Sequence, residues 1–311
     1  MKITIAIPAY KRAYLHEAIE SCLAQTYFNF ELVIVDDASP EDLYSIVEEF
    51  HDERIRYYRN EKNCGAIDVV DNWNKCLEFA TGDYIICMGD DDKLLPNCLQ
   101  EYVNLMDKYP NLGVYHAWTE IIDEKGTFVE WQIPRPEYES AYSLLWNRWV
   151  VRKRQYIGDF LFNVDCLRKN GGFYKLPLAW ASDDITALIA AKDTGIANTQ
   201  VPTFQYRENR YTISRTGNTE VKLQAVLLSK KWYELFLAEK PSNDLDYKYW
   251  ILLQEIFEKH FDYMLRGPIK QELKTKSVFR LVYWYKNRKK YNLNSFVFKR
   301  LLKDSFEILF S

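Results

Sequence analysis

The sequence of 311 residues is long enough for one large α/β domain with an additional region, or for two domains. Its formal net charge of −3 argues against a strongly basic nucleic-acid-binding protein. No stretch reaches the roughly 18 uncharged apolar residues that a membrane span requires, and the first residues predict a strand instead of a secretion signal. These features favour a cytoplasmic protein whose six scattered cysteines are reduced core thiols.

Residues 1 to about 118 alternate between strand-like and helix-like patterns with short connections. Apolar runs predict strands at 3–7, 30–35, 55–59, 84–88 and 114–118. Apolar residues at helical spacing predict helices between these runs, at about 15–23, 41–50, 67–80 and 96–106. Strands and helices in alternation predict an α/β fold with a mostly parallel sheet, right-handed crossovers and flanking helices.

Two of these predicted strands end in carboxylates. The second strand is followed by Asp36 and Asp37, and the fourth is followed, after one glycine, by the acidic triplet 90–92. Because open α/β sheets bind ligands at the carboxyl ends of their strands, we expect both clusters to open onto one crevice. Adjacent carboxylates repel one another, and a divalent cation with oxygen ligands would compensate the triplet. A solvated turn that caps the next helix is the alternative.

Several short motifs, in their order and spacing, resemble those of inverting family-2 glycosyltransferases, which have the glycosyltransferase A fold. The motifs are IAIPAY (5–10), QTYFNFEL (25–32), VIVDDAS (33–39), NCG (63–65), ATGDYI (80–85) and DDDKLLP (90–96). The resemblance covers residues 1 to about 215 and implies a Rossmann-like domain that binds a nucleotide sugar and carries out catalysis. The chain departs from the common Asp-x-Asp-Asp pattern at Gly89, which replaces the first Asp.

The resemblance implies that residues after the first two strands hold the nucleotide. Pro8, Ala9 and Tyr10 would border the base, with Tyr10 stacking on it. Asp37 would accept a hydrogen bond from a base N–H such as uracil N3, and Asp90 would lie near the ribose. A tyrosine that only packs its own loop is the alternative for Tyr10.

The resemblance also implies a metal site on the diphosphate. Asp91, with Asp92 beside it, would hold Mn²⁺ or Mg²⁺. A hard cation takes oxygen ligands and withdraws charge from the leaving nucleoside diphosphate. For Asp36 two roles stay open, one in this site and one as a partner for the dipole of the following helix.

An inverting transfer needs a base that takes the proton of the acceptor hydroxyl. Asp183 and Asp184 begin a predicted helix after the Gly-Gly-Phe segment 171–173, where the resemblance implies an acidic pair with this role. We expect Asp184 to be the base and Asp183 to be the second candidate. A helix cap with a first-turn charge is the structural alternative. Trp180 would form part of the acceptor floor, unless it packs in the core.

The segment 206–215 is dense in basic and aromatic residues. Arg210 or Arg215 would fold over the diphosphate, because a guanidinium group suits phosphate. A solvated connector is an equal alternative.

The region 216–311 is predicted to be a helical C-terminal extension. Between 270 and 303, Lys and Arg alternate with Phe, Tyr and Trp. Such a helix can lie in a membrane interface and be drawn to anionic lipid, which would place the protein at the inner face of the cell membrane. A helical cap on the catalytic domain, or on a second subunit of a homo-oligomer, is the other expectation.

Together these features predict a metal-dependent inverting glycosyltransferase. It would move a sugar from a nucleoside diphosphate, by preference UDP, to a hydroxyl of a glycan or lipid-linked glycan; the resemblance alone implies bacterial surface polysaccharide. A nucleotidyltransferase acting on a sugar phosphate is one alternative, although the Gly-rich basic loop expected after its first strand is missing here. A non-catalytic nucleotide- or carbohydrate-binding protein is the other.

Overall fold

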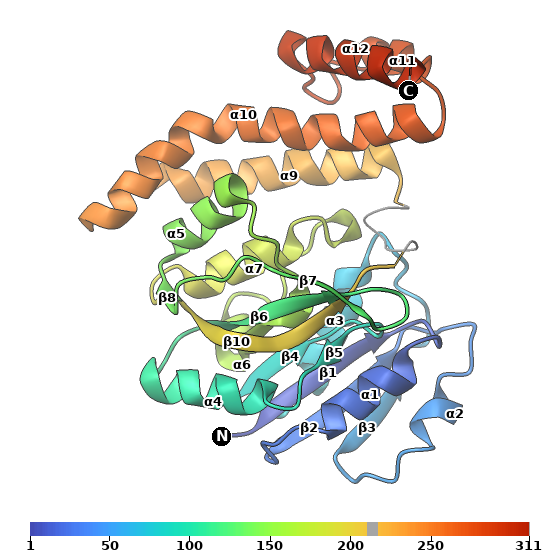
Figure 1. Cartoon of the computed structure of the whole chain (residues 1–311), viewed down its shortest axis with the longest axis vertical. Coiled ribbons are helices and arrows are strands. Elements are labelled where there is room, and N and C mark those ends of the chain that lie inside the picture. The colour runs from blue at the N-terminus through green and yellow to red at the C-terminus, as the bar shows by residue number, and fades with distance from the viewer. Residues whose placement is uncertain (210–216, 311) are drawn as a thin grey trace. The chain divides into compact units, whose positions relative to one another are not determined.

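The computed structural model describes residues 1–209 and 217–310, which fall into two compact units (Figure 1). The first unit comprises Met1–Lys175 and Ser182–Thr212. The second comprises Leu176–Ala181 and Ile213–Ser311. The chain therefore leaves the first unit for one short turn before it returns, whereas the sequence led us to expect a single boundary near residue 215.

A ten-stranded sheet forms the centre of the first unit (Figure 1). Its strands run in the order β3-β2-β1-β4-β9-β6-β10-β5, with β7 beside β6 and β8 beside β10. The strands are β1 (Ile3–Ala9), β2 (Phe30–Asp36), β3 (Ile55–Arg59), β4 (Tyr84–Cys87), β5 (Lys93–Leu94), β6 (Val114–Ile122), β7 (Phe128–Trp131), β8 (Tyr138–Glu139), β9 (Phe160–Asn163) and β10 (Ile196–Arg207).

The half of the sheet that holds β1 to β4 is parallel, as predicted. The antiparallel strand β9 lies between β4 and β6, so the two parallel parts of the sheet do not touch directly. β6 pairs in parallel with β10, and the short strands β5, β7 and β8 pair antiparallel at the far side. Every residue of β2 and β4 is buried, because helices cover both faces of this part of the sheet.

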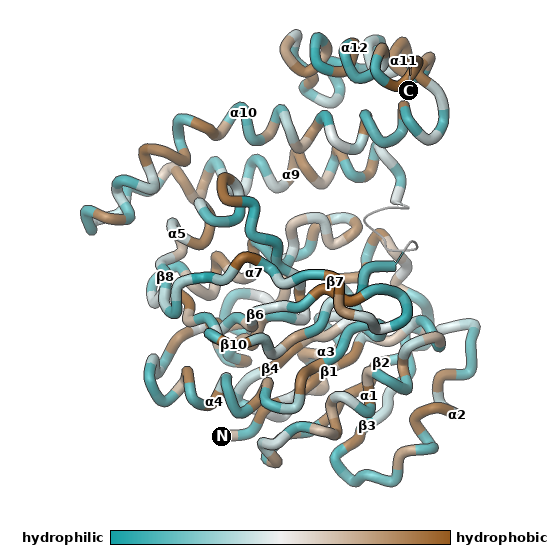
Figure 2. The backbone as a smooth tube through the Cα atoms, viewed as in Figure 1, coloured by the Kyte–Doolittle hydropathy of each residue, from teal (hydrophilic) through white to brown (hydrophobic). Residues whose placement is uncertain are grey.

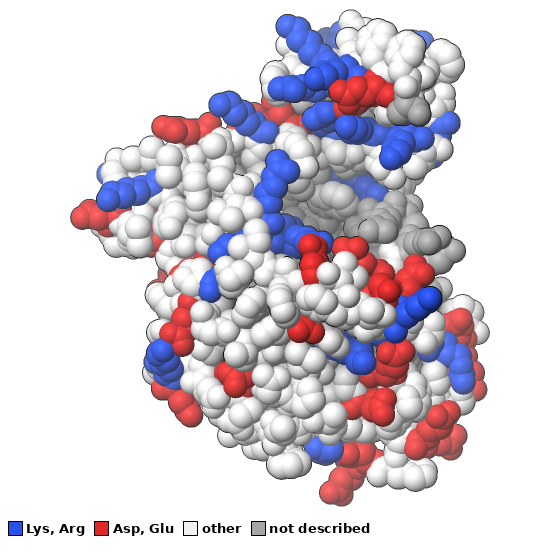
Figure 3. Space-filling view, in the orientation of Figure 1, with Lys and Arg blue, Asp and Glu red and all other residues white. Residues whose placement is uncertain are grey.

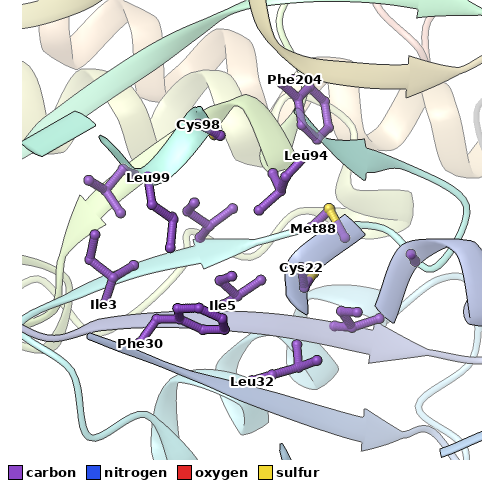
Figure 4. Close-up of a cluster of buried hydrophobic side chains, with 14 of the residues drawn as sticks. Ile3, Ile5, Cys22, Phe30, Leu32, Met88, Leu94, Cys98, Leu99 and Phe204 are labelled. Carbon is purple, nitrogen blue, oxygen red and sulfur yellow. The ribbon is translucent and has the colours of Figure 1, made fainter. Parts of the chain in front are cut away.

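The α-helices described for the first unit are α1 (Leu15–Leu23), α2 (Tyr44–Val47), α3 (Val69–Phe79), α4 (Cys98–Lys108), α5 (Ala141–Trp146), α6 (Val164–Lys169) and α7 (Ser182–Ala191). Apolar side chains from β1 and β2 meet those of α1 and α4 in one buried cluster (Figure 4). Ile5, Cys22 and Leu99 are fully buried there. The α/β fold expected from the strand and helix pattern is thus confirmed.

The second unit is helical, as predicted for the C-terminal extension. Its helices are α9 (Thr219–Ala238), α10 (Asp244–Thr275), α11 (Arg280–Lys286) and α12 (Ser295–Leu309), and α10 packs against both α9 and α12. Apolar and hydrophilic residues alternate along α10 and α12, as expected for helices with one buried side (Figure 2). Leu253 and Phe261 of α10 and Leu301 of α12 are buried. Among the described helices, none is sufficiently long and apolar to cross a bilayer.

Candidate active site

The carboxyl ends of β1 and β2 lie side by side, because the strand register pairs Ala9 with Asp36. The next residue, Asp37, donates its backbone N–H to the Ala9 carbonyl at 2.9 Å. In the residue after the end of β1, the Tyr10 carbonyl accepts a hydrogen bond from the Ser39 hydroxyl at 2.7 Å. These contacts bring the predicted base-binding residues together at one edge of the sheet. Pro8 is half-buried within β1, whereas Tyr10 is 44% exposed.

Asp90 joins the turn after β4 to the loop after β1. One oxygen of its buried carboxylate, Oδ2, accepts hydrogen bonds from the backbone N–H groups of Tyr10 and Lys11, both at 2.7 Å. Burial, together with the charge of neighbouring Asp91, raises the pKa of Asp90 to about 6. Asp90 therefore lies beside the predicted base-binding loop, with one oxygen engaged by that loop.

Asp91 and Asp92 differ in their surroundings. Asp91 is half-buried, and its Oδ2 accepts a hydrogen bond from the Asn209 side-chain amide. Asp92 is 4% exposed, and its Oδ1 accepts the backbone N–H of Arg207 at 2.9 Å. Burial raises the pKa of both carboxyls, and the charge of Asp91 raises that of Asp92 further. Asp91 is the member of the pair that a ligand can reach more easily.

The glycine that precedes this triplet has a local structural reason. A Cβ at Gly89 would lie 2.9 Å from Asp92 Oδ2 and 3.1 Å from Asp91 Oδ1. Real Cβ atoms essentially never come within 3.0 Å of another atom, so a side chain at position 89 would displace the Asp92 carboxylate and would crowd that of Asp91. The departure from the common acidic pattern thus keeps space for Asp91 and Asp92.

Arg207, at the end of β10, contacts the turn that carries Asp91 and Asp92. Its buried guanidinium donates to the Asp91 carbonyl and to Glu17, both at 2.8 Å, and lies 4.2 Å from the Tyr14 ring centroid. The sequence analysis did not single out this arginine. Its only sequence signal was its place in the basic segment 206–215, and its partners are up to 190 residues away in the chain.

The two carboxylates after β2 also differ. Asp36 is fully buried and accepts hydrogen bonds from the Ser39 N–H at 2.7 Å, the Tyr57 hydroxyl at 2.6 Å and the Arg59 guanidinium. These three donors engage both oxygens of Asp36, a pattern typical of a structural carboxylate. Asp37 anchors the loop after β3.

In Asp37, Oδ1 carries most of these contacts. It accepts from the Asn60 amide and from the Cys64 N–H, both at 2.9 Å. Oδ2 accepts the same Cys64 N–H at a longer distance, 3.1 Å, among the described residues. Since a carboxylate oxygen can accept two hydrogen bonds, Oδ2 retains capacity for a ligand N–H.

Asp183 and Asp184 lie in the first turn of α7, as predicted, but they have different partners. Asp184 accepts from Arg148 Nε, at 2.8 and 3.0 Å to its two oxygens, and from the Gln155 amide at 2.7 Å. Asp183 is half-buried, and its Oδ1 accepts the Asp184 N–H at 2.9 Å. Burial and the charge of Asp184 raise the pKa of Asp183 to about 8. Arg148 and Gln155 were not identified from the sequence.

Trp180 belongs to the second unit, at the end of the turn Leu176–Ala181. Its half-buried ring lies 5.6 Å from the Nζ atom of Lys222, a residue of α9 in the same unit that is 5% exposed. Burial lowers the pKa of Lys222. Arg210 and Arg215, predicted to contact the diphosphate, lie outside the described residues.

A divalent ion would find only part of its ligand set in the protein. Within residues 1–209 and 217–310, no three or more His, Cys, Asp or Glu side chains form a metal-binding cluster. The oxygen chemistry of Asp91 suits Mg²⁺ or Mn²⁺, and Mg²⁺ sites of nucleotide enzymes use one or two carboxylates with substrate phosphates and water. The site fits an ion that arrives with a phosphorylated substrate.

A family model described as glycosyl transferase family 2 matches residues 4–162, just over half of the chain. Among curated relatives, WcaA of Escherichia coli K12, named as a colanic acid biosynthesis glycosyl transferase, is 39% identical over 166 residues. That alignment covers 51% of this chain and 56% of WcaA. The chain spans about half the length, or less, of the first curated relatives that it matches.

Two solved structures resemble the fold. TarS 1–349 of S. aureus, described in complex with UDP-GlcNAc, has a TM-score of 0.62 at 14% identity, over 99% of this chain and 89% of that TarS chain. The mannosyltransferase PcManGT of Pyrobaculum calidifontis, described in complex with GDP-Man and Mn²⁺, has a TM-score of 0.54 at 15% identity, over 99% and 86% of the two chains. At identities this low, the similarity shows a shared fold and no more than that.

Proposed function

Since the chain belongs to glycosyl transferase family 2, as its motifs predicted, we propose that it transfers a sugar from a nucleoside diphosphate to a glycan hydroxyl, with inversion at the anomeric carbon. The observation that carries this proposal is the joined set of loops after β1, β2 and β4. There the Tyr10 N–H donates to Asp90 and the Asp37 N–H donates to the Ala9 carbonyl, beside the half-buried Asp91. Family membership favours a glycosyltransferase over the nucleotidyltransferase and the non-catalytic binding protein.

We propose UDP as the nucleotide of the donor. Asp37 Oδ2 would accept the uracil N3–H, and the exposed ring of Tyr10 would stack on the base. Asp90 would face the ribose with the oxygen that the loop after β1 does not engage. TarS and PcManGT, described in complex with UDP-GlcNAc and GDP-Man, support a nucleoside-diphosphate sugar in general.

We further propose that Asp91 holds Mn²⁺ or Mg²⁺ on the diphosphate, a role supported by the Mn²⁺ named for PcManGT. When bound, the ion would offset the charge that develops on the leaving diphosphate. Asp92 was also expected to be a ligand, but its burial and its bond to the Arg207 N–H favour a supporting role behind Asp91. Arg207 would keep Asp91 in place through the Asp91 carbonyl.

Asp184 is proposed as the base. A carboxyl group with a pKa of about 8 is mostly protonated at neutral pH, so Asp183 is poorly suited to accept a proton there. A base must be ionised before it can accept the hydroxyl proton. Arg148 and Gln155 fix the orientation of Asp184, and Asp183 is left to donate a hydrogen bond.

The acceptor is proposed to be a glycan or lipid-linked glycan of a surface polysaccharide, which the name of WcaA supports. Trp180 would offer its ring to the acceptor, since it lies only three residues before Asp183 in the chain. The proposal places the enzyme in the cytoplasm.

Thermal shift measurements with UDP, GDP, dTDP and CDP, each with and without Mn²⁺, test the donor site. We expect UDP with Mn²⁺ to raise the melting temperature most, because a ligand at a hundredfold excess over Kd stabilises the folded state by about 2.7 kcal/mol. Asp91→Ala should abolish the effect of Mn²⁺. Asp107→Ala, at an exposed position on α4, is the matched control and should respond like the wild type.

The outcomes separate the parts of the proposal. If GDP, dTDP or CDP stabilises the protein in place of UDP, the base assignment is wrong. If UDP acts equally with and without Mn²⁺, the metal assignment is wrong. If no nucleotide shifts the wild type, the loops after β1, β2 and β4 are not a donor site.

A further inference from the structure

The last forty residues carry a charge opposite to that of the whole chain. Between residues 270 and 310 there are eleven Lys and Arg against three Asp and Glu, a net charge of +8 in a chain whose total is −3. Figure 3 shows Lys and Arg side chains gathered over the α10 to α12 part of the second unit. A positive charge confined to one region indicates a surface for an anionic partner.

Two of the three acids in this region are internal and already neutralised. Asp304 of α12 is fully buried between Arg266 and Lys270 of α10. Glu272 is 3% exposed and pairs with Arg280 at 2.9 Å. These ion pairs fasten α11 and α12 to α10, and they leave Glu307, paired with Lys303 at 3.8 Å, as the acid on the outer surface of α12. The outer surface is therefore basic.

An apolar stripe runs along the same outer side of α12. Leu302, Phe306 and Leu309 are spaced by four and three residues, which places them on one side of the helix, and they are 49%, 62% and 58% exposed. Lys299 and Lys303 each lie three residues before a member of this stripe, so the basic and apolar rows are neighbours. The opposite side of α12, with Phe298 and Leu301, is buried against the unit.

The neighbouring helix extends this surface. Phe279, just before α11, and Val282 within it are 83% and 57% exposed, and α11 packs against α12. Lys286 and Lys289, at the end of α11 and just after it, are exposed as well. An amphipathic helix with an exposed apolar row and a basic row is the arrangement that lies in the headgroup region of a bilayer.

We propose that the outer surface of α11 and α12 binds the surface of an anionic lipid bilayer, with Leu302, Phe306 and Leu309 entering the headgroup region and the lysines contacting lipid phosphates. A second copy of this chain fits less well, because two surfaces of the same charge would repel each other. Nucleic acid would use the lysines but would leave the apolar stripe in water.

Flotation of the whole protein with lipid vesicles tests this surface. We expect it to float with vesicles that contain phosphatidylglycerol, not with pure phosphatidylcholine, and to be released by salt. Lys299→Gln with Lys303→Gln should weaken binding by about fivefold for each charge removed. Leu302→Ser with Phe306→Ser should also weaken vesicle binding, because it removes apolar side chains whose insertion into the headgroup region favours binding.

Two control variants remove positive charge or exposed apolar area elsewhere on the protein. Lys169→Gln with Lys192→Gln removes two exposed lysines of the first unit, and Phe28→Ser removes an aromatic side chain that is 77% exposed. Both should bind vesicles like the wild type. Absence of binding to any vesicle would overturn the proposal. Equal binding by the α12 variants, or a dimer that only these variants dissociate, would overturn it too.

Discussion

Asp36 at the end of β2 and Asp91 after β4 both follow a buried parallel strand, but their carboxylates meet different surroundings. Asp36 is fully enclosed and accepts from three protein donors, the Ser39 N–H, Tyr57 and Arg59. Asp91 is half-buried and accepts from the Asn209 amide. The strand pattern determines where a carboxylate lies, whereas the donors around it determine whether a ligand can use it.

The acidic pair on α7 differs from both of these carboxylates. Two protein donors contact Asp184, which is nevertheless the proposed base. We expect Asp184→Asn to reduce turnover by about a hundredfold or more, as loss of a general base does. Asp183→Asn should cost less than about tenfold, because an amide imitates the neutral carboxyl. Rates at saturating donor and acceptor measure both effects.

Melting temperatures of the same variants show whether Asp184 is enclosed like Asp36. Both variants should melt within a few degrees of the wild type. A strongly lowered melting temperature for Asp184→Asn, with the loss of activity in Asp183→Asn instead, would make Asp184 a structural residue and Asp183 the base.

Asp36 offers the largest expected effect on stability. Asp36→Asn should lower the free energy of unfolding by about 2–3 kcal/mol, because it leaves buried donors without their charged acceptor. Urea unfolding measures this difference, with Asp107→Asn as an exposed control that should change stability little. Unchanged stability together with lost nucleotide binding would instead place Asp36 in the donor site.

Stability is also expected to depend on pH through Asp183. Its pKa in the folded protein, about 8, is above the ordinary carboxyl value, so the folded state holds a proton that the unfolded state has lost. Stability from this group is therefore present at low pH and is lost as the pH rises towards 8. Asp183→Asn cannot ionise and removes this loss.

The melting temperature of Asp183→Asn relative to the wild type should accordingly rise between about pH 5 and about pH 9. Melting curves of both proteins across this range give the difference. A difference that is constant with pH would show that the pKa of Asp183 is the same in the folded and unfolded states.

The strands that lead to the proposed donor site could be predicted because they are buried on both faces. Such strands appear in the sequence as continuous apolar runs, and the acids that follow them mark the carboxyl edge. The antiparallel insertion of β9 could not be predicted in this way, because its apolar residues are compatible with either direction. The helix expected at about 41–50 is only Tyr44–Val47.

The positioning residues were beyond prediction for another reason. Arg148 reaches Asp184 across 36 positions of the chain, and Arg207 reaches Glu17 across 190. No local pattern distinguishes such an arginine from one that is solvated, since its role depends on tertiary contacts. The unequal partners of Asp91 and Asp92 depend on tertiary structure in the same way.

The hydrogen bonds from Tyr10 and Lys11 to Asp90 have a consequence for the rate and strength of ligand binding. Fixing a residue's backbone costs about 1–2 kcal/mol of conformational entropy. Because hydrogen bonds within the protein fix this loop, that cost falls on folding and does not reduce affinity. The loop would therefore already have its conformation when a nucleotide-sugar donor arrives, and binding would not require a change in the backbone of Tyr10.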